Sequence, residues 1–170
     1  SSWYLSGSYQ PGSGGQSYTL PWSAESNGGG YGRLGAAPTN SSGVFTYPCA
    51  GIWFISAHIS VYQTGPQNDN WAVAIAQSSN SGSNWYPILR MHSHLPAGRS
   101  PAAETKLVSV SGMHRVNSTT TERMQIRITD LNTSVGQIRG GSMGGNTLDA
   151  ADGGCFLTIM RLSPVNVSTQ

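Results

Sequence analysis

The chain has 170 residues, of which only 9 % are charged, whereas about 25 % is usual in globular proteins. Nine Lys and Arg residues against seven Asp and Glu give a net charge of +2 with no basic run, which argues against a nucleic-acid partner. No apolar run approaches the roughly 18 residues that argue for a membrane-spanning helix, so we expect no membrane insertion. Five Trp, seven Tyr and three Phe residues indicate one folded domain rather than a disordered chain.

Residues 1–16 are rich in glycine and serine, which is typical of a lead-in segment outside a folded domain. We expect either a linker or an arm that lies on a neighbouring molecule. Trp3 and Tyr4 favour the arm, because a free linker has no use for large aromatic side chains. No signal-peptide pattern or initiator Met is present, which suggests a fragment or a processed chain.

Residues 17–23 predict a short edge strand, because Pro21 is tolerated in a strand only at the edge of a sheet. The segment Asn27–Gly32 that follows is a glycine loop. It lacks the lysine and the strand–helix context of a phosphate-binding loop, so we do not interpret it as a nucleotide site.

The stretch from Gly43 to Val61 is the most strongly patterned part of the chain. A turn at residues 48–51 separates a short β-rich piece from a long one, in which alternate side chains fall on two faces. One face carries Trp53, Ile55, Ala57, Ile59 and Val61, and the other carries Ile52, Phe54, Ser56 and His58. Because Ile52 and Phe54 lie on the second face, we predict a strand buried on both sides, with one side in a sandwich core.

Further β-rich segments follow at residues 71–77, 85–94, 106–116, 122–131, 135–139 and 155–162. Polar or glycine-rich turns separate them, and no segment shows an apolar period of 3.6 over the length of a helix. The sequence therefore predicts an all-β fold, an antiparallel β-sandwich or jelly roll over residues 17–163, followed by a polar tail at 164–170.

The order of these motifs resembles the C1q/TNF-like jelly-roll superfamily. The block Gly43–Ser56 matches that family's pattern Gly-x-Phe-Thr-x-Pro-x-x-Gly-Ile-Tyr-x-Phe/Ile-Ser, with Trp in place of Tyr. Residues Leu107–Val116 resemble an inner strand of the family, and Cys155–Met160 resemble its final strand. Two departures are the segment Asn117–Glu122 in place of a Gly-Asp turn and Thr158 in place of a glycine. The first departure argues against a calcium site of the kind that the family builds from loop carboxylates.

The resemblance implies a homotrimer around a threefold axis, which would supply the partner for the second face of the Gly43–Val61 stretch. By motif position, the sandwich core would contain Trp53, Ile55 and Phe156. The residues implied at the trimer interface are Ile52, Phe54, Ser56, His58, Leu157 and Ile159. The alternative is that the N-terminal arm of the same chain covers Ile52 and Phe54.

No arrangement of side chains in the sequence indicates catalysis, and no Gly-x-Ser-x-Gly motif occurs. His92 and His94 would lie on one face of a strand, about 6.6 Å apart, where we expect a surface pair, with an axial metal site as the alternative. Asp149 and Asp152 share a glycine loop that we expect to be solvated rather than to bind calcium. We predict a non-enzymatic domain with no cofactor and no metal.

Two cysteines, Cys49 and Cys155, leave two interpretations open. They can form a disulfide if their strands are neighbours. Otherwise they are buried free thiols that behave as small hydrophobic side chains. Their spacing alone favours neither.

The charge-poor surface, the bias towards Arg over Lys and the lack of a cysteine framework favour a trimeric virion-surface module. Such a module would be a phage or viral head, knob, fibre or decoration domain that contacts a host surface glycan, a protein receptor, or a capsid or tail protein. A cap that only stabilises the capsid is a weaker version of this hypothesis. The alternative is an extracellular, secreted C1q-domain recognition protein that binds glycan or protein ligands.

Ligand contacts are predicted in loops at one end of the trimer, because aromatic rings stack on sugar C–H faces while amides bond hydroxyl groups. The predicted contact residues are Gln67, Asn68, Asn70, Trp85 and Tyr86, together with the loop Gly140–Gly154. Trp85 and Tyr86 could equally belong to the core.

Overall fold

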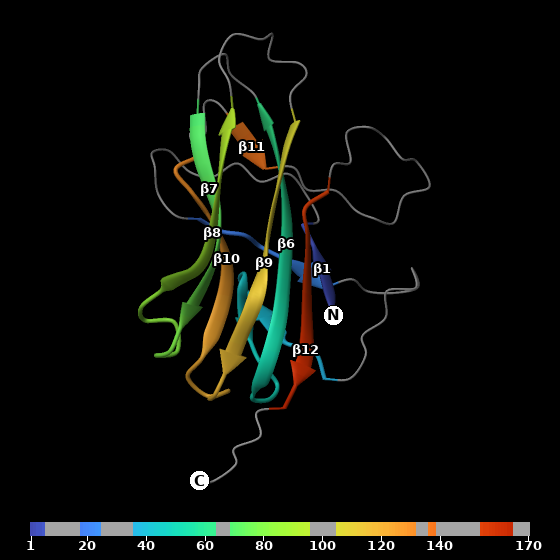
Figure 1. The fold of residues 1–170 in the computed structure, drawn as a ribbon, viewed down its shortest axis with the longest axis vertical. Coiled ribbons are helices and arrows are strands. Elements are labelled where there is room, and N and C mark those ends of the chain that lie inside the picture. Colours follow the sequence, from blue (N-terminus) through green and yellow to red (C-terminus); the bar gives the residue numbers. More distant parts are fainter. Residues whose placement is uncertain are drawn as a thin grey trace, which may run out of the picture.

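A computed structural model of the chain describes residues 1–5, 18–24, 36–63, 69–95, 105–131, 136–138 and 154–164. These residues form two antiparallel β-sheets that pack face to face (Figure 1). The described residues include no helix, and therefore no helix that is long and apolar enough to cross a membrane. The predicted all-β antiparallel sandwich is confirmed.

The first sheet is organised around the longest strand, so we call it the β6 sheet. It contains β9 (Thr105–Val116), β6 (Gly51–Gln63), β12 (Phe156–Ser163), β11 (Gly136–Ile138), β1 (Ser2–Tyr4) and β3 (Ser23–Ala24). Strand β9 pairs with one edge of β6 over almost its full length, while β12 and β11 share the other edge. Strand β1 then pairs with β12, and β3 pairs with β1.

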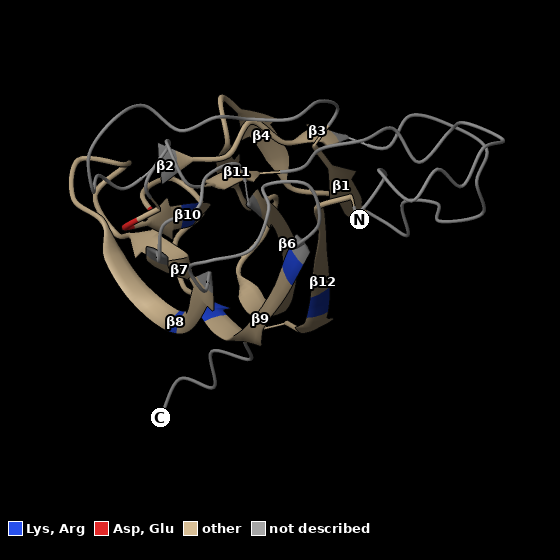
Figure 2. Cartoon of the chain, turned by 90° about the horizontal axis from the view of Figure 1, so that it is seen from above, with Lys and Arg blue, Asp and Glu red and all other residues tan. Residues whose placement is uncertain are grey.

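The second sheet, called the β7 sheet, closes the other side of the sandwich. It contains β4 (Thr39–Ser41), β5 (Val44–Thr46), β2 (Tyr18–Thr19), β10 (Arg123–Thr129), β7 (Asp69–Ser78) and β8 (Tyr86–Leu95). Strands β10 and β7 pair at its centre, β8 forms one edge, and β5 and β2 share the far side of β10. Charged side chains are sparse on both sheets (Figure 2).

The core lies between the two sheets and confirms the predicted inner face of β6. Trp53, Ile55, Ala57, Ile59 and Val61 are at most 2 % exposed. Side chains from the opposite sheet that are equally buried include Phe45, Trp71, Ile75, Met124 and Ile126. Removing these large apolar side chains from water is the main force that holds the two sheets together.

The N-terminal residues differ from the prediction of a lead-in or an arm on a neighbouring molecule. Residues 2–4 form β1 between β12 and β3, and Trp3 is only 5 % exposed in the core of its own chain. Its ring packs edge-on against Phe45, with ring centroids 5.0 Å apart. Residues 1–5 therefore belong to the sandwich, and the rest of the predicted lead-in, residues 6–16, lies outside the described residues.

The predicted edge strand at residues 17–23 is divided between the two sheets. Strand β2 pairs with β10 in the β7 sheet, whereas β3 pairs with β1 in the β6 sheet. The chain crosses from one sheet to the other at Leu20–Trp22, where Leu20 and Trp22 are buried and Pro21 is exposed. Pro21 thus lies at the crossing rather than within either strand.

The turn between β9 and β10, where the family pattern has Gly-Asp, is fixed by Glu122. Its Oε1 atom accepts hydrogen bonds from the backbone N–H groups of Asn117 and Ser118, at 3.0 and 3.1 Å. Its Oε2 atom lies 3.6 Å from Nε2 of His114, and both side chains are buried. Burial lowers the pKa of His114 although Glu122 acts to raise it, so the imidazole is neutral at pH 7.

The two cysteines are free thiols at opposite ends of the sandwich. Cys155 is buried beside Ser60, whose backbone N–H donates to its Sγ atom at 3.2 Å, whereas Cys49 precedes the other end of β6. Gly51 and Ser60 are nine residues apart along β6, or about 30 Å, far beyond the reach of a disulfide. Burial raises the pKa of the Cys155 thiol to about 12, so it has little nucleophilic thiolate at neutral pH.

Two turn glycines give a matched test of backbone packing, since both have positive φ angles. A Cβ atom on Gly43, at φ 83°, would lie 2.3 Å from the carbonyl oxygen of Leu20, whereas one on Gly82, at φ 96°, would meet nothing closer than Trp85 at 3.6 Å. We expect Gly82→Ala to cost about 1–2 kcal/mol for the left-handed conformation. Gly43→Ala should cost about 1–3 kcal/mol more, because it also collides with backbone. Urea unfolding of both variants measures the difference, and equal losses would contradict the packing described at Gly43.

Candidate functional site: the outer face of the β6 sheet

The side of the β6 sheet that points away from the core is the candidate site, and we call it the outer face. Strand residues alternate between the core and this face, as their burial shows along β6, β9 and β12. Its described members include Tyr4, Ile52, Phe54, Ser56, His58, Tyr62, Leu107, Ser109, Ser111, Met113, Arg115, Phe156, Thr158 and Met160. No other described strand packs across it (Figure 1).

Cross-strand pairing arranges these side chains in rows that run across three strands. Phe54 lies between Met113 of β9 and Met160 of β12, which makes an apolar row. In the next row, Ser56 lies between Ser111 and Thr158, so three hydroxyl groups stand side by side.

The third row has His58 between Ser109 and Phe156. Beyond it, Leu107 of β9 stands beside Ser60 of β6. The outer face therefore carries hydroxyl groups and one imidazole among apolar side chains, and exposed Arg115 stands beside Ile52 at one end.

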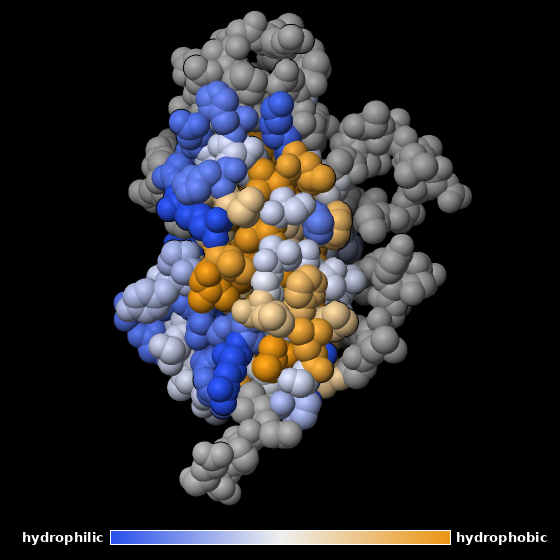
Figure 3. Space-filling model, in the orientation of Figure 1, coloured by the Kyte–Doolittle hydropathy of each residue, from blue (hydrophilic) through white to orange (hydrophobic). Residues whose placement is uncertain are grey.

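Large apolar side chains are exposed on this face. The exposed fractions are 69 % for Met113, 63 % for Leu107, 48 % for Met160 and 39 % for Phe156, while Ile52 and Phe54 are half-buried. Figure 3 shows hydrophobic residues gathered over β6, β9 and β12, beside a hydrophilic surface over β7 and β8. Soluble monomers rarely expose a contiguous apolar surface of this kind unless it binds something.

His58 is held on three sides by its neighbours on the outer face. Its Nδ1 atom lies 2.7 Å from Oγ of Ser109, and its Nε2 atom lies 3.2 Å from Oγ of Ser56. Its ring stacks on Phe156 with centroids 4.1 Å apart and an interplanar angle of 17°. Partial burial lowers the pKa of His58 below the usual value, which favours the neutral ring.

In the last strand, β12, the side chains that face outward are one residue away from those predicted at the trimer interface. Leu157 and Ile159, predicted at the trimer interface, are at most 1 % exposed and pack in the core opposite Ala57 and Ile55. Phe156, predicted in the core, lies on the outer face instead. A shift of one residue moves every side chain of a strand to the opposite face, which accounts for all three assignments.

The residues predicted to bind a ligand do not form one site. Asn70 is exposed near the start of β7, whereas Trp85 and Tyr86 lie at the start of β8, next to the other end of β7. Seven residues of β7 separate these ends, which corresponds to about 23 Å. Tyr86 is 62 % exposed and Trp85 is half-buried. Gln67, Asn68 and residues 140–153 of the predicted binding loop lie outside the described residues.

The histidine pair His92 and His94 is exposed on the outer side of the β7 sheet. Nδ1 of His94 lies 2.8 Å from Oδ1 of Asn70. Because the pair belongs to the sheet opposite the outer face, it does not face the region where we expect a threefold axis. Within the described ranges no group of three or more His, Cys, Asp or Glu side chains could hold a metal ion, and Asp149 and Asp152 lie outside them.

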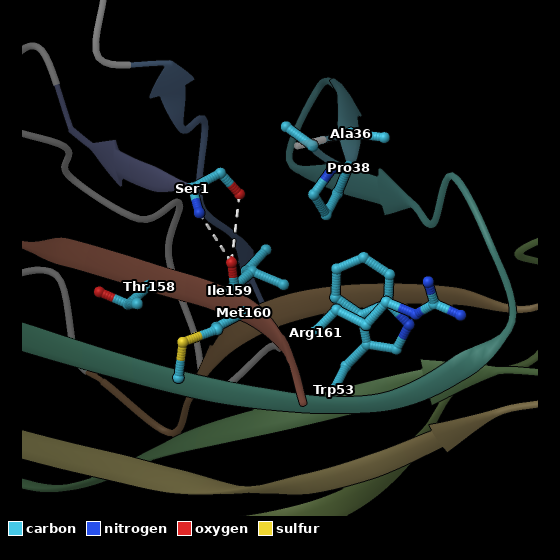
Figure 4. A pocket seen from close by; sticks show the side chains of 9 residues that line it. Ser1, Ala36, Pro38, Trp53, Thr158, Ile159, Met160 and Arg161 are labelled. Atoms are coloured by element: carbon cyan, nitrogen blue, oxygen red, sulfur yellow. Dashed lines mark hydrogen bonds between the residues drawn. The ribbon is translucent and has the colours of Figure 1, made fainter. Parts of the chain in front are cut away.

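A pocket of about 300 Å³, which sequence reasoning did not predict, opens at the edge of β12 (Figure 4). It lies where β1 begins, and the Ser1 nitrogen and hydroxyl both donate to the carbonyl oxygen of Ile159. Its described walls include Pro38, Trp53 and Arg161, so residues far apart in sequence meet only in the folded chain. The Arg161 guanidinium donates to the carbonyl oxygen of Ala50 at 2.8 Å. The described lining offers no nucleophile–base pair, so it does not indicate an active site.

Comparisons with known proteins support the fold. No protein-family model matches the sequence, and no curated protein sequence matches it either. A crystal structure of murine APRIL has a TM-score of 0.57 and 10 % identity, covering 95 % of this chain and 98 % of APRIL. The structure of the Eiger TNF from S. frugiperda has a TM-score of 0.58 and 11 % identity, covering 99 % of this chain and 96 % of Eiger. The chain therefore has a TNF-like jelly-roll fold, as the sequence resemblance implied.

Opposite faces of β12 can be tested with two adjacent substitutions that introduce the same charge. We expect Phe156→Asp to leave the chain folded, because its side chain points out of the sandwich. Leu157→Asp should unfold it, because a buried, unpaired carboxylate replaces a core leucine and costs several kcal/mol. Near-ultraviolet circular dichroism and thermal melting of both variants provide the measurement. The reverse result, a folded Leu157→Asp and an unfolded Phe156→Asp, would overturn the face assignment.

Proposed function

We propose that this chain is a non-enzymatic recognition domain that assembles as a homotrimer through the outer face of its β6 sheet. The observation that carries the proposal is the row of Met113, Phe54 and Met160 beside solvent on a sheet that no other described strand covers. Burying one such side chain contributes about 1.5–3 kcal/mol. Three copies of the row would supply ample driving force for association.

A threefold arrangement is favoured over other assemblies by the fold. The C1q/TNF-like resemblance of the sequence implies three copies around an axis, and the TNF-like fold agrees with that implication. In an assembly with closed cyclic symmetry every copy of the interface surface is buried, so no copy is left free to add further chains and form an open-ended polymer. Ile52, Phe54, Ser56 and His58 remain the proposed interface residues, with Phe156 and Met160 in place of Leu157 and Ile159.

The chemistry of the outer face supports a binding role rather than catalysis. His58 contacts the hydroxyl groups of Ser109 and Ser56, but among the described residues no carboxylate orients its ring. The neighbouring backbone N–H groups belong to a sheet in which β6 is paired along both edges, so they do not form an oxyanion hole.

The binding partner is proposed to be a receptor or glycan contacted by parts of the trimer away from the outer face. The TNF-like fold favours an extracellular ligand or recognition domain, which agrees with the secreted alternative. The virion-surface setting, with a host receptor or a capsid protein as partner, stays a prediction that rests on composition alone.

The molecular mass in solution is the primary test. We expect sedimentation velocity at micromolar concentration to give about 54 kDa, three times the chain mass of 17.9 kDa. A single species of the chain mass would contradict the proposed assembly.

The interface residues are tested by Phe54→Asp, with His92→Asp as a control that places the same charge on the opposite sheet. We expect Phe54→Asp to weaken trimer formation by at least about a thousandfold, because three phenylalanines lose their burial and three carboxylates repel one another. His92→Asp should leave the mass unchanged. A Phe54→Asp protein that stays trimeric would show that the outer face is not the interface.

A further inference from the structure

The hydrogen bonds of His58 suit both protonation states of the ring in a single chain. Ser109 and Ser56 present one hydroxyl group to each ring nitrogen, at 2.7 and 3.2 Å. A hydroxyl group can donate to a bare ring nitrogen or accept from a protonated one. In a single chain the half-exposed imidazole can therefore bind a proton without losing a hydrogen bond.

Among the residues that the structure describes, none near this ring would compensate a positive charge if a second copy covered it. Beside it stand Ser109 on β9 and Phe156 on β12. The other titratable or charged groups that the described strands place on this face are Tyr4 of β1, Tyr62 of β6 and Arg115 of β9. No carboxylate is among them, and Arg115 pairs with Ile52, six residues along β6 from His58 or about 20 Å away, too far for a screened charge to act strongly on the ring.

We propose that assembly of the trimer is linked to protonation of His58, so that acidification separates the copies. This inference rests on the proposed function, because it requires a second copy to cover the outer face. Covering the ring with the described outer face of a second copy removes water from around it and supplies no carboxylate, and the protonated form loses more by this than the neutral form does. Three rings near one axis would also repel one another once charged.

The sign of the linkage follows from the direction of the pKa change. If assembly lowers the pKa of His58 further, the single chain binds protons more tightly than the trimer does. Association is then strongest well above the usual histidine pKa of about 6.5 and weakens as the pH falls through the pKa of the separate chain. A drop of one unit in the pKa at each of three rings would weaken assembly by about a thousandfold.

The test is sedimentation velocity of the wild-type chain from about pH 8 to about pH 5, with near-ultraviolet circular dichroism to show that the chains stay folded. We expect trimers at the upper pH and folded single chains at the lower pH. His58→Asn, whose amide can still bond Ser109 but does not titrate, should stay trimeric throughout. His92→Asn, which removes an exposed histidine from the opposite sheet, should dissociate as the wild type does.

Each other result has a distinct meaning. A wild-type trimer that persists at low pH, or a His58→Asn trimer that dissociates like the wild type, would overturn the link to His58 while leaving the trimer intact. Single chains at the upper pH would overturn the proposed assembly itself, and the linkage with it. Loss of the near-ultraviolet signal together with the trimer would mean that acid unfolds the chain, for example through buried His114, and would also overturn the proposal.

Discussion

A β-strand with apolar side chains on both faces is the constraint on which this structure depends. The inner face of β6 is satisfied within one chain, because Trp53, Ile55 and Ile59 pack against the β7 sheet. The apolar side chains of the other face are not buried in the same way, since no described strand covers Ile52 and Phe54. The strands on either side of β6 also expose apolar side chains on this face, namely Met113 on β9 and Met160 on β12, both beside Phe54.

The outer face is not uniformly apolar, and its polar groups affect how specifically copies of the chain can associate through it. Its hydroxyl row and His58 lie among apolar side chains, and Arg115 stands beside Ile52 at one end, so an assembled interface would contain polar groups that need partners. Such groups contribute less to affinity than buried apolar side chains but make association specific and responsive to solution conditions. The proposed pH dependence follows from this mixture, because a fully apolar face would have nothing to titrate.

Much of the fold could be predicted from the sequence because the signals were local. The alternation of Trp53, Ile55 and Ala57 with Ile52 and Phe54 gives the position and both faces of β6 without tertiary information. Strand β1 could not be predicted, since three residues in a glycine-rich segment carry no periodicity, and only pairing with β12 makes them a strand. The interface predicted from the sequence was wrong at Leu157 and Ile159 because both faces of β12 carry apolar side chains, and periodicity alone does not say which face is inside.

The predicted ligand site failed for a different reason. Aromatic and amide residues near strand ends indicate binding loops, but composition does not say which loops lie at the same end of the sandwich. Asn70 and Trp85 lie at opposite ends of the β7–β8 hairpin. The pocket beside β12 had no sequence signal at all, because Pro38 and Arg161 meet only in the folded chain.

Oxidation of individual methionines by peroxide, followed by mass spectrometry, tests most directly whether the outer face is covered in solution. In the single chain Met113 is 69 % and Met160 48 % exposed, whereas Met124 in the core is fully buried and serves as the internal reference. An assembled protein should oxidise Met113 and Met160 nearly as slowly as Met124 at high concentration, and faster on dilution. Rapid oxidation of Met113 and Met160 at every concentration would mean that the outer face is open to water and that copies of this chain do not cover it.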